Sequence, residues 1–216
     1  GWRGGSPKQF EKHCQYLASR GMVAMAADYR VLSRHKTKAD SCVADAKSAV
    51  RFIRQHAPRL GVDPDRIVAA GGSAGGHIAA CTGTIAELDE STEDAKISSQ
   101  PNAMILFNPA VVLAPVDGDL PVRNPEQLAE RTGVEPRRIS PYHHVRSGLP
   151  PTLILHGEAD TTVKFQTVQW FTAAMKKAGN RCELAGYKGA GHGFFNYGRD
   201  KNRYFITTMN RSDEFL

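Results

Sequence analysis

A serine, a pair of carboxylates and a histidine follow apolar segments in an order that could support nucleophilic catalysis. Ser73 lies in the sequence 71–75, Gly-Gly-Ser-Ala-Gly, which matches the G-x-S-x-G pattern of a nucleophile on a strand-to-helix turn. Glu158 and Asp160 share a later turn, and His192 lies in a glycine-rich loop near the end of the chain. A serine hydroxyl needs an imidazole to take its proton, and the imidazole needs a carboxylate to orient it. The order Ser, acid, His predicts a serine hydrolase.

The residues around Ser73 fit a strained turn. Small neighbours two residues to each side allow a strand and the following helix to pack closely, so that the serine oxygen projects freely. The amide of Ala74 would lie at the helix N-terminus, where it could donate to an oxyanion. The alternative is a flexible or phosphate-binding loop. The segment lacks the Lys-Ser/Thr ending of a nucleotide loop and does not match G-x-G-x-x-G, which disfavours nucleotide binding.

Eight histidines compete for the role of base. His192 is the predicted base because it follows the last predicted strand. We expect His77 to support the serine turn by packing, and His156 to be structural. His143 and His144 fall in an irregular region, where they either contact substrate or lie on a solvated loop. The contexts of the remaining three are helical or charged, and predict surface positions for His13, His35 and His56.

Apolar runs of strand length alternate with amphipathic helical patterns. The predicted strands are 22–27, 67–70, 103–107, 152–155 and 183–187. The predicted helices are 6–20, 40–56, one from 74 to about 88, 163–178, and a closing helix from 203. This alternation predicts an α/β fold with a mostly parallel sheet flanked by helices. Ser73, Asp160 and His192 all follow strands, so we expect them at one edge of the sheet.

The periodicity is lost between Val111 and Pro151, a stretch with seven prolines and one short helical pattern at 125–131. We interpret residues 111–151 as a cap-like excursion outside the core layers. The chain of 216 residues is otherwise long enough for one α/β domain, spanning 1–216.

Composition argues against several other classes of protein. The 28 basic and 22 acidic side chains give a formal charge of +6, but the excess is scattered, which disfavours nucleic-acid binding. The four cysteines show no C-x-x-C spacing, so we predict neither a zinc site nor a disulfide framework. No run of about 18 apolar residues is present, so we predict no membrane span.

Together these residues resemble the acetyl-esterase and hormone-sensitive-lipase-like branch of the α/β hydrolases, a BD-FAE-like carboxylesterase group. The resemblance covers nearly the whole chain and rests on segments 28–30, 45–51, 61–67, 71–77, 156–160 and 191–194. It implies the α/β-hydrolase fold, ester hydrolysis and the choice of Asp160 over Glu158. Some members of the branch deacylate plant polysaccharide, which makes carbohydrate-linked acetyl or feruloyl esters expected substrates by analogy.

The N-terminus departs from the family pattern. The branch carries His-Gly-Gly-Gly ahead of a tryptophan, and its glycine amides supply oxyanion donors, whereas this chain starts at Gly1-Trp2. We therefore expect an N-terminally truncated hydrolase domain that lacks the first strands, with Gly1 as a second oxyanion candidate beside Ala74. Compartment and oligomeric state stay open.

The prediction is thus a serine carboxylesterase that acts through an acyl-enzyme on a small-molecule or polysaccharide ester, with no metal and no cofactor. Two alternatives remain. One is a serine peptidase of the prolyl-oligopeptidase type, and the other is a non-catalytic fragment, which the incomplete oxyanion loop would favour.

Overall fold

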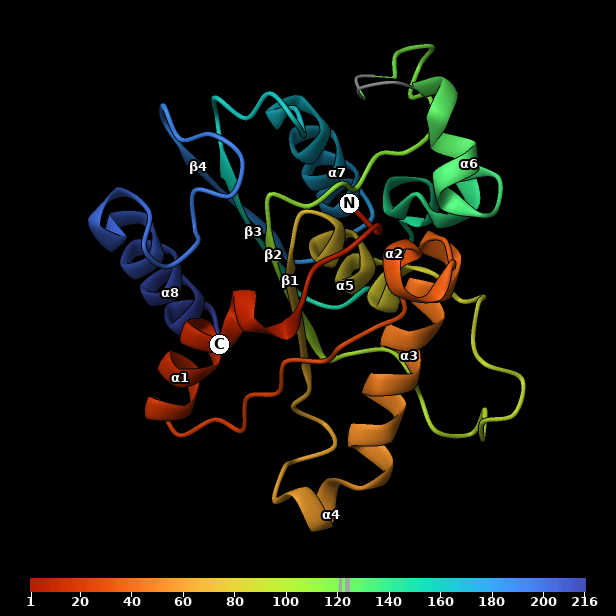
Figure 1. The fold of residues 1–216 in the computed structure, drawn as a ribbon, viewed down its shortest axis with the longest axis vertical. Coiled ribbons are helices and arrows are strands. Elements are labelled where there is room, and N and C mark those ends of the chain that lie inside the picture. The colour runs from red at the N-terminus through yellow and green to blue at the C-terminus, as the bar shows by residue number, and fades with distance from the viewer. Residues whose placement is uncertain (121, 123–124) are drawn as a thin grey trace.

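The computed structural model contains a sheet of four parallel strands in the order β1-β2-β3-β4 (Figure 1). The strands are β1 Val68–Gly72, β2 Ala103–Phe107, β3 Thr152–Gly157 and β4 Cys182–Tyr187. The structure describes residues 1–120, 122 and 125–216. Gly72 pairs with Phe107, and Phe107 pairs with Leu155, so the carboxyl ends of β1, β2 and β3 meet at one edge. The predicted parallel sheet is confirmed.

Helices cover both faces of the sheet, as parallel connections require. The α-helices are α1 Glu11–Ser19, α2 Leu32–His35, α3 Ala39–Gln55, α4 Ala57–Leu60, α5 Ala74–Thr84, α6 Leu128–Thr132, α7 Phe165–Lys177 and α8 Arg203–Phe215. The 3-10 helices are η1 Pro7–Phe10, η2 Pro125–Gln127, η3 Pro136–Ile139, η4 Pro141–His144 and η5 Asp200–Asn202. On one side α5 packs on β1 and β2, α7 packs on β3 and β4, and α3 packs outside α5. On the other side α8 packs on β3 and against α1.

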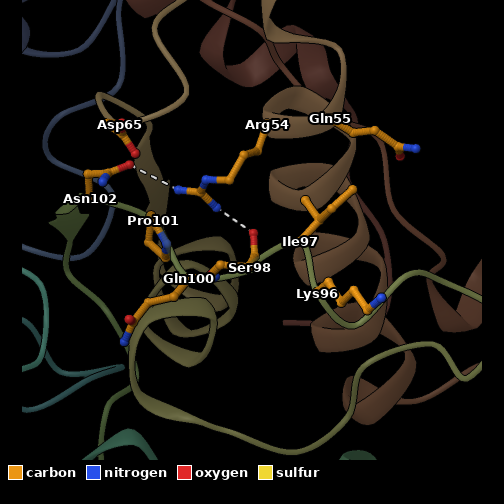
Figure 2. Close-up of a pocket in the computed structure, with 9 residues that line it drawn as sticks. All are labelled: Arg54, Gln55, Asp65, Lys96, Ile97, Ser98, Gln100, Pro101 and Asn102. Atoms are coloured by element: carbon orange, nitrogen blue, oxygen red, sulfur yellow. Dashed lines mark hydrogen bonds between the residues drawn. The ribbon is translucent and has the colours of Figure 1, made fainter.

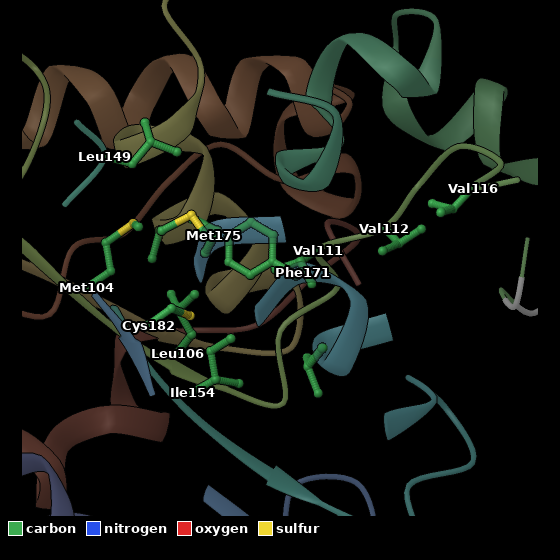
Figure 3. Close-up of a cluster of buried hydrophobic side chains, with 13 residues drawn as sticks. Met104, Leu106, Val111, Val112, Val116, Leu149, Ile154, Phe171, Met175 and Cys182 are labelled. Atoms are coloured by element: carbon green, nitrogen blue, oxygen red, sulfur yellow. The ribbon is translucent and has the colours of Figure 1, made fainter. Parts of the chain in front are cut away.

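Alternating side chains of the central strands fill two separate cores. Met104, Leu106 and Ile154 point toward α5 and α7, where they pack with Phe171 and Met175 (Figure 3). Their neighbours along the strands face α1 and α8, and this second set includes Ile105, Phe107, Leu153 and Leu155. Strands that are apolar on both faces therefore hold the helices on both sides.

The strand predicted at 22–27 is not formed. Residues 22–31 carry no strand, and the side chains of Val23 and Met25 are 54% and 43% exposed. A strand needs a neighbour to accept and donate its backbone hydrogen bonds. Among the described residues, no strand lies beside this segment, since β1 pairs only with β2. The predicted strand is therefore wrong, because an apolar run alone does not show whether a neighbouring strand is there to pair with it.

The predicted surface position of His13 is also wrong. The residue is 2% exposed on α1, and four phenylalanine rings surround it with centroids 4.6 to 5.8 Å away: Phe10, Phe107, Phe195 and Phe205. Within the described chain its ring nitrogens have no side-chain hydrogen-bond partner. Burial among apolar groups disfavours the imidazolium, and it lowers the pKa of His13 to about 4.

This shift predicts a loss of stability in mild acid. Below the ordinary pKa of 6.5 the unfolded chain binds a proton at His13, while the folded chain does not until the pH reaches about 4. Falling pH through this window therefore favours unfolding, by about 2–3 kcal/mol for this one group. We expect His13→Leu to show a smaller loss of unfolding free energy between about pH 7 and pH 4.5, measured with urea. His35→Leu, at an exposed histidine, is the control, and equal losses in both variants would contradict the assignment.

Two basic side chains on α3 fix the connection between α5 and β2. Lys47 is 2% exposed, and its Nζ donates to the carbonyls of Ile85 at 3.1 Å and Glu87 at 2.5 Å and pairs with Asp89. Arg51 is similarly buried, pairs with Asp89 and Glu93, and donates from Nε to the Ile97 carbonyl at 2.8 Å. These bonds hold the acidic loop between α5 and β2, residues 85–97, against α3.

The excursion at 111–151 begins inside the molecule. Val111, Val112 and Leu113 are at most 2% exposed, and the Leu113 amide donates to Ser140 Oγ at 2.9 Å. The predicted helix at 125–131 corresponds to η2 and α6. Residues 121, 123 and 124 of the excursion lie outside the described part of the chain. The cap-like role of the excursion stays a prediction.

Candidate active site

Ser73 occupies the turn between β1 and α5, in a backbone conformation that few side chains adopt. Its φ is 55° and its ψ is −116°. The glycines before it are required by close packing: a Cβ at Gly71 would lie 2.4 Å from the Gly75 carbonyl oxygen, and one at Gly72 would lie 2.3 Å from Phe195 Cζ. Strained backbone of this kind is concentrated at functional sites. The glycines before Ser73 thus permit a turn in which the serine hydroxyl points away from the edge of the sheet.

The structure brings Ser73, His192 and Asp160 together at the carboxyl edge. His192 Nε2 lies 2.9 Å from Ser73 Oγ, and His192 Nδ1 lies 2.7 Å from Asp160 Oδ2. In the tautomer that satisfies both contacts, Nδ1–H donates to the carboxylate and Nε2 accepts from the hydroxyl. Glu158, the other carboxylate of the turn, is exposed and makes no hydrogen bond to His192 among the residues described.

The Asp160 carboxylate is buried and is held by several donors. Oδ1 accepts the amides of Thr162 at 2.8 Å and Val163 at 2.9 Å, and the side chain has no solvent exposure. Burial alone raises the pKa of a carboxyl group, but the hydrogen bonds from His192, Val163 and Thr162 outweigh it and keep the pKa of Asp160 below its ordinary value. The carboxylate is therefore charged at neutral pH, as the orientation of a protonated imidazole requires.

His156 supports this carboxylate turn from inside the sheet. It is fully buried, its Nε2 donates to the Val163 carbonyl at 2.8 Å, and the same nitrogen lies 3.5 Å from Asp160 Oδ2. Burial lowers its pKa, so the ring is neutral. This arrangement agrees with the structural role expected of His156.

Two backbone groups remain candidates for binding an oxyanion. Ala74 is the first residue of α5, where amides have no acceptor within the helix. Gly1 lies at the start of the chain, and its carbonyl accepts from Arg131 Nη2 at 3.4 Å. Neither assignment is tested by a bound group, and both stay predictions.

His77 joins three segments behind the serine turn. Trp2 Nε1 donates to its Nδ1 at 3.1 Å, and its Nε2 donates to the Ile139 carbonyl at 2.6 Å. Burial lowers the pKa of His77 to about 4, so the ring stays neutral and one tautomer serves both bonds. The residue ties the N-terminal segment and the excursion to α5, as a packing role predicts.

The two histidines of the excursion, His143 and His144, contact groups of the excursion itself. His143 contacts Ser140 Oγ at 2.8 Å and the Pro115 carbonyl at 3.0 Å, and His144 Nε2 contacts the Arg137 carbonyl at 3.1 Å. These contacts order the excursion itself. Contact with a substrate stays untested.

A polar hollow of about 570 Å³ lies at the opposite edge, beside the amino ends of β1 and β2 (Figure 2). Its central side chain, Arg54, donates to the carbonyls of Pro64 and Ser98 and to Asn102 Oδ1. Each nitrogen of the guanidinium thus makes one hydrogen bond within the protein. None of the predicted site residues lines this hollow.

Sequence reasoning missed Asn108, the residue that follows β2. It is fully buried, and its Oδ1 accepts the Gly193 amide at 3.1 Å, next to His192. The available signal was the Asn-Pro pair directly after an apolar strand, which marks a turn at the functional edge.

A parallel sheet between helices, with a serine on the strand-to-helix turn and a carboxylate and histidine following later strands, defines an α/β hydrolase. The BD-FAE family model matches residues 1–175, and the chain belongs to this family.

The chain is also similar to solved and curated esterases. The apo form of Thermogutta terrifontis esterase 2 is 58% identical, with a TM-score of 0.96, and the match covers 100% of this chain and 79% of that one. The same esterase has been solved with propionate bound and phosphonylated by sarin. A probable isoprenylcysteine alpha-carbonyl methylesterase of Arabidopsis thaliana is 27% identical and esterase LipC of Mycobacterium tuberculosis is 28% identical, each over 82% of this chain. The chain spans only 40% and 46% of the length of these two relatives.

No helix in the described residues is both long and apolar enough to cross a bilayer. Within the same residues, no group of three or more His, Cys, Asp or Glu side chains is arranged to hold a metal ion.

Proposed function

We propose that the chain is a serine carboxylesterase that hydrolyses carboxylic esters through an acyl-enzyme, with Ser73 as nucleophile, His192 as general base and Asp160 as the orienting acid. The observation that carries this proposal is the continuous hydrogen-bond chain from Ser73 Oγ through His192 to Asp160, with distances of 2.9 and 2.7 Å. Membership of the BD-FAE family and similarity to esterases support the reaction class.

In the proposed mechanism, Ser73 Oγ attacks the ester carbonyl while its proton passes to His192 Nε2. The imidazolium is stabilised by Asp160, and the amide of Ala74 donates to the oxyanion, with Gly1 as the second candidate. His192 then protonates the departing alcohol, and the acyl group remains bound to Ser73 Oγ as an ester. Water then attacks the acyl carbonyl while His192 takes its proton. His192 passes this proton to Ser73 Oγ as the bond to the acyl group breaks, which releases the acid and restores the serine hydroxyl.

We propose short acyl esters as the substrate class, with carbohydrate-linked acetyl esters among them. The support is the binding of propionate by the Thermogutta esterase, an acid of the size that a short acyl-enzyme would release. A feruloyl ester has a much larger acyl group and is the alternative within the same chemistry.

A panel of substrates tests this proposal. The expected result is turnover of p-nitrophenyl acetate and butyrate, with slower turnover of the dodecanoate and no cleavage of an alanyl-prolyl p-nitroanilide. Preferential cleavage of the anilide would instead support the peptidase alternative.

Labelling with a fluorophosphonate probe provides the second test. We expect one adduct, located on Ser73 by peptide mass spectrometry, in a sample whose near-ultraviolet circular dichroism shows a folded protein. A folded sample that hydrolyses no ester and remains unlabelled would support a non-catalytic fragment.

A further inference from the structure

Asn108 lies at a corner of the chain that contacts both the serine turn (residues 71–75) and the histidine loop (residues 189–194). On one side, the Ser73 amide donates to the carbonyl of Phe107 at 2.9 Å. On the other side, Asn108 Oδ1 accepts the amide of Gly193 at 3.1 Å. Two adjacent residues at the end of β2 thus bind the backbone on each side of the Ser73–His192 pair.

The next residue strengthens the contact with the serine turn. A Cβ at Gly76, in the first turn of α5, would lie 3.0 Å from Cβ of Pro109. The ring of Pro109 therefore packs closely against the helix that starts at Ala74. The corner is fixed to the sheet as well, because the Asn108 amide donates to the Leu155 carbonyl at 2.8 Å.

The conformation of Asn108 is costly in two ways. Its φ is 34°, in the left-handed region that asparagine tolerates better than most residues. Its side chain is fully buried, yet Nδ2 has no hydrogen-bond partner within the described residues. Strain and unsatisfied polar groups together are typical of functional sites.

The Asn108 side chain is one of several contacts that hold the histidine loop: the Ala159 amide donates to the Ala190 carbonyl at 3.0 Å, and Asn196 Nδ2 donates to the Gly193 carbonyl at 2.8 Å. His192 is followed by Gly193, whose φ is 71°, and the His192 carbonyl accepts from the exposed side chain of Arg199 at 2.9 Å. The Gly193 amide points the other way, toward the interior, where Asn108 is its acceptor. Without that acceptor, a buried backbone N–H would be left unpaired, and the loop would have to move toward water to satisfy it.

We propose that Asn108 is a positioning residue that sets the distance between Ser73 Oγ and His192 Nε2. It acts by holding the Gly193 amide to the same corner that holds the Ser73 amide. This inference rests on the proposed esterase function. Because proton transfer requires hydrogen-bond contact between the two side chains, a shift of about 1 Å can lower the rate by about 100-fold.

The decisive variant is Asn108→Gly, because glycine keeps the left-handed backbone and removes the side-chain acceptor. We expect kcat for p-nitrophenyl acetate to fall by about 10- to 100-fold, with KM changed by less than about threefold, since the group does not bind substrate. Rates are normalised to the folded fraction of each sample, measured by near-ultraviolet circular dichroism, so that unfolded protein does not contribute. Asn108→Ser, whose hydroxyl is too short to replace the amide, provides the same test if the glycine variant does not fold.

Rescue by Asn108→Asp separates the hydrogen bond from the backbone effect. Aspartate has the same length and restores an acceptor for Gly193, so we expect kcat to return to within about fivefold of the unchanged protein. Asn180→Ala is the matched control. Asn180 is another buried asparagine, whose Oδ1 accepts the Leu149 amide at 3.0 Å away from the site, and its loss should lower Tm without changing kcat.

A native kcat in folded Asn108→Gly, or a loss in Asn108→Asp as large as in Asn108→Gly, would overturn the positioning role. Failure of the proposed function is distinguishable, because the unchanged protein would then neither hydrolyse the ester nor react with the probe.

Discussion

Ser73→Ala is expected to lower kcat for p-nitrophenyl acetate by about 10⁴- to 10⁶-fold while the protein stays folded. The hydroxyl is the only group lost, and the turn that carries it is built from backbone and glycine packing rather than from the serine side chain. Alanine is also small enough for the turn, although it retains the cost of a positive φ. Residual turnover should show no burst of nitrophenol, because no acyl-enzyme can form.

The matched control is Ser98→Ala. Ser98 is exposed at the opposite edge of the sheet, where its hydroxyl accepts the Gln100 amide at 3.1 Å. This variant should retain activity within about twofold, as surface substitutions usually do. Activity of Ser73→Ala within tenfold of the unchanged protein would contradict the assignment of the nucleophile.

Asp160→Asn is expected to lower kcat by about 10⁴-fold at neutral pH. The asparagine fits the same space and can still accept the amides of Thr162 and Val163 through its carbonyl oxygen. Its NH₂ group, however, would then face His192 and donate to Nδ1. That contact stabilises the tautomer with a proton on Nε2, which cannot accept the proton of Ser73.

Glu158→Gln tests the other carboxylate of the same turn. Glu158 is exposed and does not contact His192 in the part of the chain described, so we expect this variant to retain kcat within about threefold. A larger loss for Glu158→Gln than for Asp160→Asn would reverse the roles of the two acids.

The parts of the site that follow from chain order could be predicted from the sequence. Parallel strands place their carboxyl ends at one edge, so a serine, a carboxylate and a histidine that each follow a strand had to come close in space. The glycines around Ser73 indicated the turn, because only residues without a Cβ permit the packing seen at Gly71 and Gly72.

The sequence patterns were wrong at His13 and silent at Lys47 and Asn108, because the environment of each of these residues comes from distant segments. His13 has a helical pattern around it, but its burial depends on Phe195 and Phe205, far along the chain. Lys47 lies on the buried side of α3 because carbonyls of the following loop and Asp89 accept its protons. Asn108 likewise acts through Gly193, 85 positions away. Hydrophobic periodicity assigns polar residues to the surface. It carries no information about partners that are distant in the sequence.

The order of strands in the parallel sheet also determines at which stage of folding Ser73, Asp160 and His192 come together. Ser73 and His192 are separated by 119 positions, and Asp160 and His192 by 32. During synthesis the serine turn can form early, because β1 and α5 are adjacent, whereas the last partner arrives only after β4. Non-local contacts of this kind form slowly. Recovery of ester cleavage after dilution from denaturant would therefore report the final docking of the C-terminal loop rather than the first collapse of the chain.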